Sequence, residues 1–453
     1  MKKSLILLLL LLLCACSNND APITSPSSFI LHNVNIIDVE NGSILPAKSI
    51  VIKQGEIADI IDVTSSYTPS DLAVIDGKNG YVTPGLIDMH VHMYEPAAYV
   101  LALSHGVTHV RIMNGVPEQL KWRDQIAAGS LIGSSSSVSS PIISGYEDAP
   151  LHHTVHTAAA AEKAVKSYHS QGYDLIKAYG NLNEQSLTAI IKTGQKLAMP
   201  IAKHGPHGSG DMPLSALSGL QSFEHVEDIY QGTLNHKVSL EKLDKVSADL
   251  KRIDVPVTPT LNIYHQLTQL TVQKEKYLAE THQEYTSEII AFEAKSNQVE
   301  RWLSASQNMA IHNKKIMNFL LKITKTLHES EVELLVGSDS GVLLSPHGLA
   351  THNEIKLLAQ AGLNNYEVLA AATINPAKAL NLATKLGKVA PNFKADFIYS
   401  TSNPIVDLSV LQYPQAVVKH GQWYSQQQLQ TLREEAINSR SFWQELFVLG
   451  SAL

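Results

Sequence analysis

Short apolar segments alternate with helical patterns through the middle of this chain, and no other feature limits its fold as strongly. Eight segments are typical of buried strands: "GLIDMHVH" (85–92), "THVRIMN" (108–114), "PIISG" (141–145), "YDLIKAYG" (173–180), "MPIAKHG" (199–205), "SFEHVE" (222–227), "VPVTPTLNIY" (255–264) and "ELLVGSDSG" (333–341). Helical patterns separate most of them, for example over 158–171 and 183–197. Eight strand–helix units over roughly 290 residues predict an α/β fold, a TIM-type (β/α)8 barrel. An open doubly wound sheet is disfavoured, because no G-x-G-x-x-G turn follows the first strand.

Both ends of the region that we expect to fold have a different, β-rich pattern. Runs such as "FILHNVNIID" lie between Gly and Asn-Gly turns over residues 29–82, and residues 385–430 have a similar pattern. We therefore expect the two ends to pair into a small composite β-sandwich beside a barrel over residues 83–384. A C-terminal helix is expected over residues 431–453.

Two segments within the barrel region have biased compositions. Residues 265–313 are polar, charged and helix-prone, which predicts a helical cap inserted over the barrel mouth. Surface helices without contact to a ligand are the alternative. The serine-rich "GSSSSVSS" over 133–140 is expected to be a loop without chemistry.

The N-terminus is typical of an export signal. Lys2 and Lys3 precede an apolar run that is too short to span a membrane. "LCAC", ending at Cys16, resembles a bacterial lipobox, in which this cysteine becomes the lipidated first residue. A plain signal peptide cut nearby is the alternative. We expect a leader over 1–16, a flexible tether over 17–28 and a lipid anchor on the periplasmic side or outer membrane of a bacterium.

Cysteine usage and charge exclude several kinds of function. Both cysteines lie in the leader, so lipidation of Cys16 leaves no thiol for disulfides, nucleophilic catalysis or metal binding. Any metal ion must then be held by histidines and carboxylates. The net charge of −7 and the lack of a basic stripe argue against nucleic acid as a partner.

The predicted strands end in residues that suit metal chemistry. With 20 histidines in 453 residues, chance alone gives about one His-x-His pair, so "HVH" means little by itself. In a barrel, however, the C-terminal strand ends meet at one rim. Six residues fall at this predicted rim: His90, His92, Lys177, His204, His225 and Asp339. Because residues two apart in a strand point the same way, His90 and His92 would both face the barrel axis.

At these positions the chain resembles the amidohydrolase superfamily, in the branch similar to imidazolonepropionase-like and prolidase-like enzymes. The matching pieces are "VTPGLIDMHVH", "GVTHVRIM", "GYDLIKAYG", "SFEHVE", "VTPTL", "VGSDSG" and "AATINPAKAL". The family fold is a barrel with a composite β-sandwich, which agrees with the pattern above. The chain departs from the family at Asn392 and Phe393, which stand where the family has a glycine turn.

The resemblance implies a binuclear centre of two divalent metal ions, with zinc favoured. It places His90, His92 and Asp339 on one ion and His204 and His225 on the other. Lys177 would bridge them as a CO2-derived carbamate, which requires a neutral amine. Two ions that share a water lower its pKa towards 7. Asp339 would then be catalytic, taking the proton and passing it to the leaving amine.

Four further residues are candidates for substrate contact. They are His152, His153, His207 and Tyr179, with solvated loop positions as the alternative for each. His204-x-x-His207 lacks the glutamate that relatives that deaminate bases carry, which argues against a deaminase. Arg111 is expected to pair with a barrel carboxylate in a structural role.

The sequence therefore predicts an exported, lipid-anchored, metal-dependent amidohydrolase. A metal-bridged hydroxide would cleave an amide or peptide-like C–N bond in a small substrate such as a dipeptide or an N-acyl amino acid. One alternative is a mononuclear cyclic-amide hydrolase of the same superfamily, with Lys177 unmodified. Another is a non-catalytic surface binding lipoprotein, and a homo-oligomer is left open.

Overall fold

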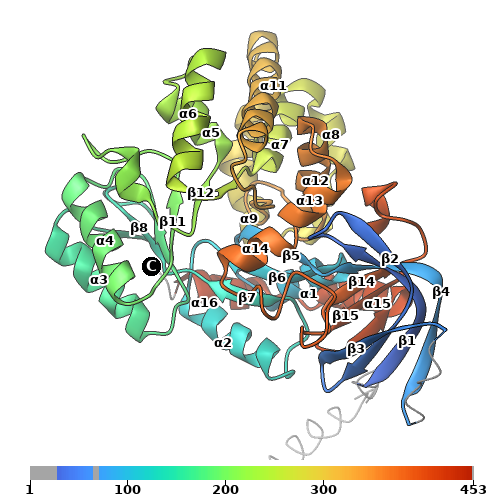
Figure 1. Ribbon diagram of the computed structural model, residues 1–453. Helices are drawn as coiled ribbons and strands as arrows, with labels where there is room; N and C mark the ends of the chain where they lie inside the picture. The colour runs from blue at the N-terminus through green and yellow to red at the C-terminus, as the bar shows by residue number, and fades with distance from the viewer. Residues whose placement is uncertain (1–27, 65–70, 451–453) are drawn as a thin grey trace, which may run out of the picture.

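A computed structural model describes residues 28–64 and 71–450 (Figure 1). These residues form an α/β structure with three sheets and many covering helices. The predicted leader, the tether up to residue 27 and Cys16 lie outside the described residues. Within the described ranges, no helix is both long and apolar enough to cross a membrane.

The two ends of the chain meet in one seven-stranded sheet, which we call the terminal sheet. Its strands are β1 (Phe29–Asp38), β2 (Ser43–Lys53), β3 (Glu56–Asp62), β4 (Ala73–Pro84), β14 (Phe397–Ser400), β15 (Ala416–Lys419) and β16 (Gln422–Ser425). The spatial order is β16-β15-β14-β4-β1-β2-β3, so the antiparallel pair β14–β4 joins the C-terminal part to the N-terminal part. Asn392 has a left-handed φ of 69°, which asparagine tolerates, at the position where the family has its glycine turn.

Two parallel sheets carry the segments that were predicted to form the barrel. One contains β5 (Leu86–Val91), β6 (Val107–Ile112) and β7 (Ser135–Val138). The other contains β8 (Ile142–Ser144), β9 (His152–Thr154), β10 (Ile176–Ala178), β11 (Ile201–His204), β12 (Ser222–Glu224) and β13 (Val257–Thr258). Its order is β13-β12-β11-β10-β8-β9. The strands run parallel, so their carboxyl ends lie together, as a rim site requires.

Isolated parallel bridges link these two sheets. Ser139 pairs with Leu175, Val257 with Leu334, and Val91 with Ser340. The segment predicted as the eighth strand, residues 333–341, is therefore held by two bridges and is not assigned as a strand. The described residues contain no closed sheet, so the (β/α)8 barrel stays a prediction.

The prediction of a loop over 133–140 is wrong for four of its residues, because Ser135–Val138 form strand β7. Serine gives no apolar alternation, so the pattern concealed the strand. Burial of the serines on either side of β7 is possible because their hydroxyls find backbone acceptors, whereas the buried Ser136 hydroxyl within β7 has no hydrogen-bond partner among the described residues. Ser134 Oγ donates to Val107 O at 2.6 Å, and Ser139 Oγ donates to Ser140 O at 2.8 Å.

Several of the covering helices start at side-chain caps. They are α1 (Pro96–Ser104), α2 (Pro117–Ala127), α3 (Ala158–Ser170), α4 (Glu184–Lys196), α5 (Val226–Asp228), α6 (Leu240–Ile253), α7 (Leu261–Gln273), α8 (Glu275–Glu280), α9 (Glu288–Ala294), α10 (Glu300–Leu303), α11 (Gln307–Glu329), α12 (Leu349–Ala361), α13 (Asn365–Ala371), α14 (Ile374–Ala379), α15 (Gln426–Asn438) and α16 (Phe442–Gly450). Short 3-10 turns lie at Leu214–Leu217, Gln283–Tyr285 and Leu408–Leu411, and π-turns at Ile229–Thr233 and Lys295–Val299. At the start of α4, the Asn183 side chain accepts from Ser186 N. This helix then buries Leu187, Ile190 and Ile191 at helical spacing.

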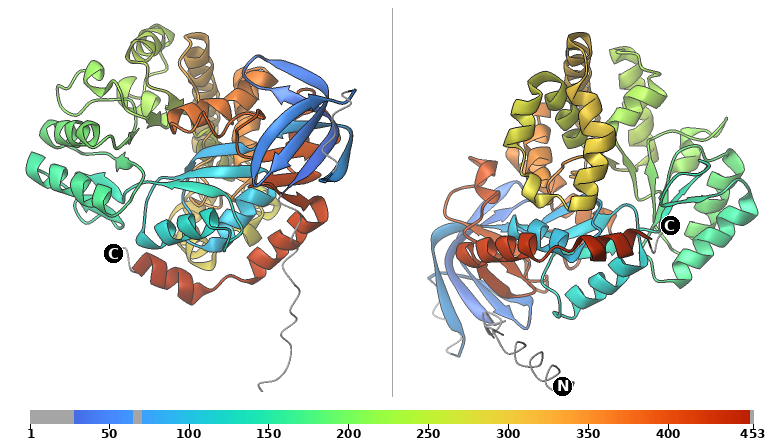
Figure 2. Two further views of the ribbon diagram at one scale, coloured as in Figure 1. Left: turned by 60° about the horizontal axis from the view of Figure 1, so that its bottom comes forward. Right: turned by 180° about the vertical axis from the view of Figure 1, so that it is seen from behind.

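The segment predicted as a cap, residues 265–313, is mostly helical from α7 to the start of α11. Where one C-terminal helix was predicted over 431–453, the described residues form two, α15 and α16, with a break at 439–441. Both red helices run along an edge of the molecule in Figure 2 (left).

Candidate metal centre

Five of the six residues predicted at the rim lie in or directly after the carboxyl ends of assigned parallel strands. His90 and His92 are at the end of β5, Lys177 is in β10, His204 ends β11, and His225 follows β12. Asp339 lies in the segment that bridges to β5. We call these six residues the rim cluster. Three of them, His90, Lys177 and Asp339, are buried.

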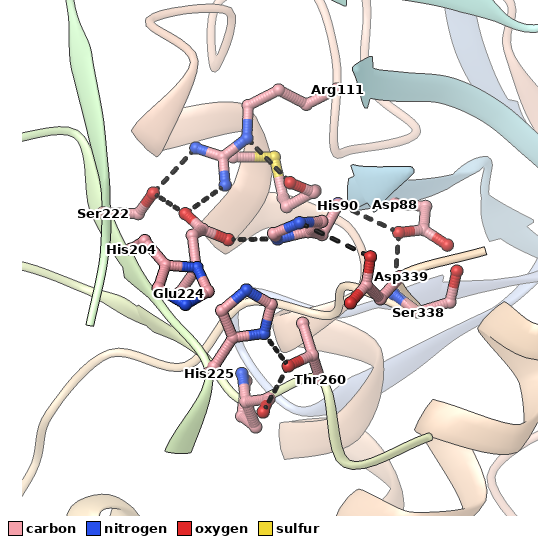
Figure 3. A network of polar contacts seen from close by, with 12 residues as sticks. Asp88, His90, Arg111, His204, Ser222, Glu224, His225, Thr260, Ser338 and Asp339 are labelled. Carbon is pink, nitrogen blue, oxygen red and sulfur yellow. Dashed lines mark hydrogen bonds and ion pairs between the residues drawn. The ribbon is translucent and has the colours of Figure 1, made fainter. Parts of the chain in front are cut away.

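Side chains of the rim cluster approach one another closely (Figure 3). Asp339 Oδ1 is 3.0 Å from His92 Nε2 and 3.6 Å from His90 Nε2. The His225 ring centre lies 4.7 Å from that of His90 and 4.5 Å from that of His204. Among the described residues, His90, His225 and Asp339 each offer a ligand atom within 4.8 Å of the others, so they could hold a metal ion.

Three of the histidines use one ring nitrogen for a partner outside the cluster. His90 Nδ1 is 2.8 Å from Glu224 Oε2, and His225 Nδ1 is 2.6 Å from Thr260 Oγ1. His204 Nε2 is 3.1 Å from Asp228 Oδ2. Metal-binding histidines are commonly oriented in this way, because the outer partner fixes the tautomer and leaves the second nitrogen for the ion.

The carboxylate behind His90 is itself anchored. Arg111, fully buried, donates to Glu224 Oε1 at 2.6 Å and to Met89 O at 2.7 Å. This confirms the prediction that Arg111 pairs with a carboxylate of the predicted barrel. Burial alone would raise the pKa of Glu224, but the Arg111 guanidinium and the bond to His90 hold this pKa well below its usual range. Glu224 is therefore ionised and can orient His90.

The electrostatics favour neutral bases in the cluster. Burial lowers the pKa of His90 to about 4 and that of His225 to about 3, so both imidazoles are neutral at pH 7. Burial also lowers the pKa of Lys177 to about 8, which leaves part of its amine neutral near physiological pH. Neutral imidazoles and free amines have the lone pairs that a metal ion or CO2 requires.

Two buried nitrogens of the cluster have no hydrogen-bond partner within the described part of the chain. They are Lys177 Nζ and His204 Nδ1. Buried polar atoms normally have a partner, and each missing partner costs free energy. A bound cation, with a carboxylated Lys177, would satisfy both atoms. The donor set of imidazoles, one aspartate and one lysine therefore fits a divalent metal site.

The backbone beside the cluster takes conformations that side chains rarely adopt. His225 has φ 69° and Thr260 has φ 50°, both in the left-handed half of conformational space. For a β-branched residue such as threonine this conformation is costly. Strain of this kind concentrates at functional sites, and here it brings Thr260 Oγ1 to His225.

The four candidate substrate residues have different fates. The Tyr179 ring lies 4.0 Å from the His204 ring, and His152 packs on Tyr179 at 5.2 Å. His153 turns away, with its Nδ1 2.6 Å from the Tyr168 hydroxyl. His207 packs near Gly205 and Gly232 and lines a surface hollow with Leu214 and Val246. Of the four, Tyr179 contacts the rim cluster directly, and His152 packs behind Tyr179.

The predicted cap segment reaches this region. Tyr285, Thr286 and Ser287 line a small hollow together with His92 and Tyr94. His347 also lines it, and its Nδ1 is 2.9 Å from Ser340 Oγ, one residue after Asp339. The inserted helices thus contribute to the surroundings of His92.

Sequence reasoning missed the second layer of residues around the cluster. Glu224 and Asp228 flank His225 in "FEHVED", and Asp88 precedes His90 in "IDMH". Asp88 accepts hydrogen bonds from the backbone of His90 and Ser338, which ties β5 to the segment carrying Asp339. Strand alternation does not separate Glu224 from His225, because both side chains reach His90 and the left-handed φ of His225 interrupts the alternation after β12.

Comparisons of the sequence with known proteins find one family and short matches to curated relatives. The family model described as "Amidohydrolase family" matches residues 81–424. Adenine deaminase 1 of Latilactobacillus sakei is 37% identical over 68 residues, which cover 15% of this chain and 11% of that protein. A dihydroorotase of Anaeromyxobacter dehalogenans is 33% identical over 69 residues, covering 14% and 16%. The chain thus matches only about a tenth to a sixth of the length of these curated relatives.

Solved structures match over much more of the chain. Bottromycin amidohydrolase has a TM-score of 0.75 at 21% identity, covering 92% of this chain and 91% of that one. A Xaa-Pro dipeptidase with bound methionine has a TM-score of 0.67 at 21% identity, covering 88% and 100%. At such identities the likeness shows the fold alone. The family model, in contrast, spans most of the chain and includes every residue of the rim cluster, so the chain belongs to the amidohydrolase family.

Proposed function

We propose that this chain is a metal-dependent hydrolase that cleaves the C–N bond of a small amide or peptide-like substrate. One observation carries the proposal. His90, His204 and His225 each have one ring nitrogen beside a partner outside the cluster, while their rings converge beside Asp339 and the unpartnered Lys177 amine. A structural role would leave no reason for two unsatisfied nitrogens in one buried place of the described chain.

The rim cluster would hold two divalent ions, with zinc favoured. His90, His92 and Asp339 would bind one, and His204 and His225 the other. A divalent ion, when bound, acidifies a water molecule and polarises a carbonyl group. The remaining chemistry falls to the side chains of the chain.

Lys177 would act as the bridge after carboxylation. Its neutral amine adds to CO2, forming an N–C bond and releasing one proton, and the product is a carbamate anion. Because burial keeps the pKa of Lys177 near 8, the neutral amine is accessible without strong base. The carbamate turns a repelled cation into an anionic ligand at the same position.

Asp339 would carry the proton. Burial alone would raise the pKa of Asp339, but His90 and His92 beside it hold this pKa well below its usual range. The carboxylate is therefore ionised and can accept the proton of the attacking water. It then returns the proton to the nitrogen that leaves as an amine.

Tyr179 and His152 border the cluster on one side and are the residues that we propose for substrate contact. Dipeptides and N-acyl amino acids are the proposed substrates, since both carry an amide that fits this chemistry. The relatives named adenine deaminases match too short a stretch to transfer their reaction. His207 packs against Gly205 and supplies no carboxylate beside His204, which supports amide hydrolysis over deamination.

We further propose that the two parallel sheets close into a (β/α)8 barrel, supported by the three bridges between them. The lipid anchor at Cys16 and export to the periplasmic side are likewise proposed, on the N-terminal sequence alone.

The test is the metal content per chain, measured by elemental mass spectrometry after purification with zinc and bicarbonate. The parent should hold about two ions, and Lys177→Ala fewer. Lys192→Ala, on the exposed face of α4, is the matched control and should keep the parent's content. Hydrolysis of dipeptide and N-acyl amino acid panels is then followed with the loaded protein.

The other outcomes separate the alternatives. One ion in both the parent and Lys177→Ala would favour the mononuclear reading, with Lys177 unmodified. Metal without any hydrolysis would favour a binding lipoprotein. No metal in either form would refute the catalytic proposal.

A further inference from the structure

The last helix of the described chain has two unlike faces. Glu445 and Val448 are buried on the inner face of α16. Phe442, Trp443, Leu446 and Phe447 are exposed to 43, 75, 44 and 69%. Their spacing of i, i+1, i+4 and i+5 places them together on the outer face of a helix. We call these four residues the α16 patch.

This helix is fixed to the body of the protein, so its exposed face is a property of the fold. Arg440, just before α16, donates to Tyr285 O and Thr286 O and pairs with Glu95 at 2.9 Å. Glu445 accepts a hydrogen bond from Ser287 Oγ inside the protein. These contacts hold α16 against the inserted helices and keep the α16 patch pointing outward.

We propose that the α16 patch docks on the surface of a lipid bilayer, an inference that rests on the lipid anchor proposed at Cys16. Trp and Phe rings favour the boundary between head groups and acyl chains. A helix with such an apolar face lies in the plane of that boundary. α16 would do so with Trp443 and Phe447, its two most exposed side chains, entering the bilayer.

The tether can bring this face to the same membrane. Phe29, where β1 begins, packs on Trp423 with ring centres 6.1 Å apart, and α15 starts three residues after Trp423. α15 is about 20 Å long and α16 follows after a short break, so α16 starts at most roughly 50 Å from the point where the tether joins the fold. The tether has to span only the part of this separation that lies along the membrane normal. Residues 17–28 can extend to about 40 Å. A lipid on Cys16 and the α16 patch can therefore occupy one bilayer surface together.

Charge defines the kind of membrane. α16 contains no lysine or arginine, and the whole chain has a net charge of −7. Docking must therefore come from apolar contact, with no attraction to anionic lipid. We expect binding to zwitterionic phosphatidylcholine vesicles that does not weaken when salt is raised.

The experiment uses the full chain, lipidated in a bacterial host and reconstituted into phosphatidylcholine vesicles with brominated acyl chains. Bromine quenches tryptophan that touches the acyl chains. The parent should lose emission relative to unbrominated vesicles, and Trp443→Phe should lose most of this difference. Absence of quenching with the lipid present on Cys16, verified by mass spectrometry, would refute docking while the anchor stands.

A second measurement removes the anchor. A chain starting at residue 17 contains every described element and is floated with the same vesicles. Its partition should fall at least about tenfold in Trp443→Ser and again in Phe447→Ser, as expected for apolar side chains that leave a bilayer. Val406→Ser, which changes an equally exposed valine between β14 and β15, should keep the parent's partition.

The same assay distinguishes the two proposals. If the chain starting at residue 17 floats with the vesicles and the full chain carries no lipid on Cys16, docking is supported and the anchor is refuted. Concentration-dependent dimers that disappear in Trp443→Ser, without vesicle binding, would assign the α16 patch to a second copy of the chain and overturn the proposal.

Discussion

The rim cluster and the terminal sheet each bury a lysine, and the surroundings of the two side chains are opposite. Lys419 Nζ, in β15, donates to Asp396 Oδ2 at 2.6 Å, and Asp396 Oδ1 accepts from His420 N at 2.6 Å. Lys177 Nζ, in β10, has no hydrogen-bond partner among the described residues. Burial lowers the pKa of both amines.

The difference teaches which observation marks a site. Both lysines are buried and both pKa values are shifted in the same direction, so neither property separates function from structure. The presence or absence of a hydrogen-bond partner does distinguish the two lysines. Lys419 belongs to a closed ion pair that completes a fold, whereas the Lys177 amine remains available to something that the chain itself does not supply.

Asp339 and Asp396 extend the comparison to the carboxylates, and here the largest effect is expected. Asp339→Asn removes the proton carrier, so turnover of an amide substrate should fall by about 10²–10⁴-fold, the usual contribution of a general base. Asp396→Asn should retain the turnover of its folded fraction. Steady-state kinetics on metal-loaded proteins measures both, and circular dichroism verifies the fold. Equal losses of turnover in the two variants would undo the distinction between site and sheet.

Substituting the lysines tests the comparison through stability. Lys419→Met leaves Asp396 buried without its cation, so the free energy of unfolding should fall by about 3–5 kcal/mol. Lys177→Met removes an amine with no hydrogen bond, so the metal-free protein should lose nothing or gain stability. Urea unfolding of chelator-treated protein gives both values. A large loss in Lys177→Met would mean that the chain itself supplies a partner for this amine.

The pH dependence gives a third test. Burial lowers the pKa of Lys177 from 10.5 to about 8, so between these values the unfolded chain holds a proton that the folded chain has released. Below pH 8 Lys177 is protonated in both the folded and the unfolded state, and the cost of burying its charge is fully present. As the pH rises from about 8 to about 10.5, the free energy of unfolding of the metal-free protein increases by up to about 3 kcal/mol. Unfolding at about pH 7.5 and about pH 10 should show a smaller gain in Lys177→Met. Burial also lowers the pKa of Lys203 to about 8, and the Lys177 charge contributes to this shift, so the difference between the two proteins reports Lys177 together with its effect on Lys203.

Much of the fold could be predicted, because buried strands and helices leave a regular spacing of apolar residues, with turn residues between the elements. The apolar alternation of 29–82 and the helical spacing in α4 were readable. β7 was not, since a serine-rich strand flanked by buried serines that bond to backbone carbonyls resembles a loop in composition. The break between α15 and α16 was also missed. Arg440 at this break binds backbone carbonyls of the inserted segment, and no local sequence pattern encodes such a contact.

For the site, the predicted strand ends indicated which residues come together, but they did not indicate which residues orient them. His90, His225 and Asp339 come together as the strand order requires. Glu224, Asp228 and Thr260, which orient the histidines, depend on side-chain directions and on the unusual φ of Thr260. Substrate contact at His153 and His207 stays a prediction, and their surroundings show that a histidine near a strand end can turn to Tyr168 or to a surface hollow.

Asp228 allows a smaller test inside the site. The Asp228 Oδ2 atom lies 3.1 Å from His204 Nε2. Among the described residues Asp228 forms no ion pair with a lysine or arginine, unlike Asp396, which pairs with Lys419. Asp228→Asn keeps the size but removes the charge that orients His204, so metal affinity should fall by about 10–100-fold. Competition with a chromogenic chelator measures this affinity. Asp211→Asn, at an exposed position before η1, is the control, and an equal loss there would show that Asp228 acts only through net charge.

The smallest effect is expected at an exposed pair in the terminal sheet, and it sets the scale for Lys419. Lys48 and Asp62 face each other across β2 and β3 and form an ion pair, with 66% of the Asp62 side chain exposed. Water screens such a pair, so Asp62→Asn should cost at most about 1 kcal/mol of unfolding free energy, and less in high salt. Urea unfolding at two salt concentrations measures it. Lys419→Met should exceed this loss severalfold and respond little to salt, because burial and not charge alone makes the Lys419–Asp396 pair costly to break. If Asp62→Asn lowered the unfolding free energy as much as Lys419→Met does, the terminal sheet would tolerate no charge change at either position. The contrast between Lys419 and Lys177 would then reflect the terminal sheet and not the missing partner of Lys177.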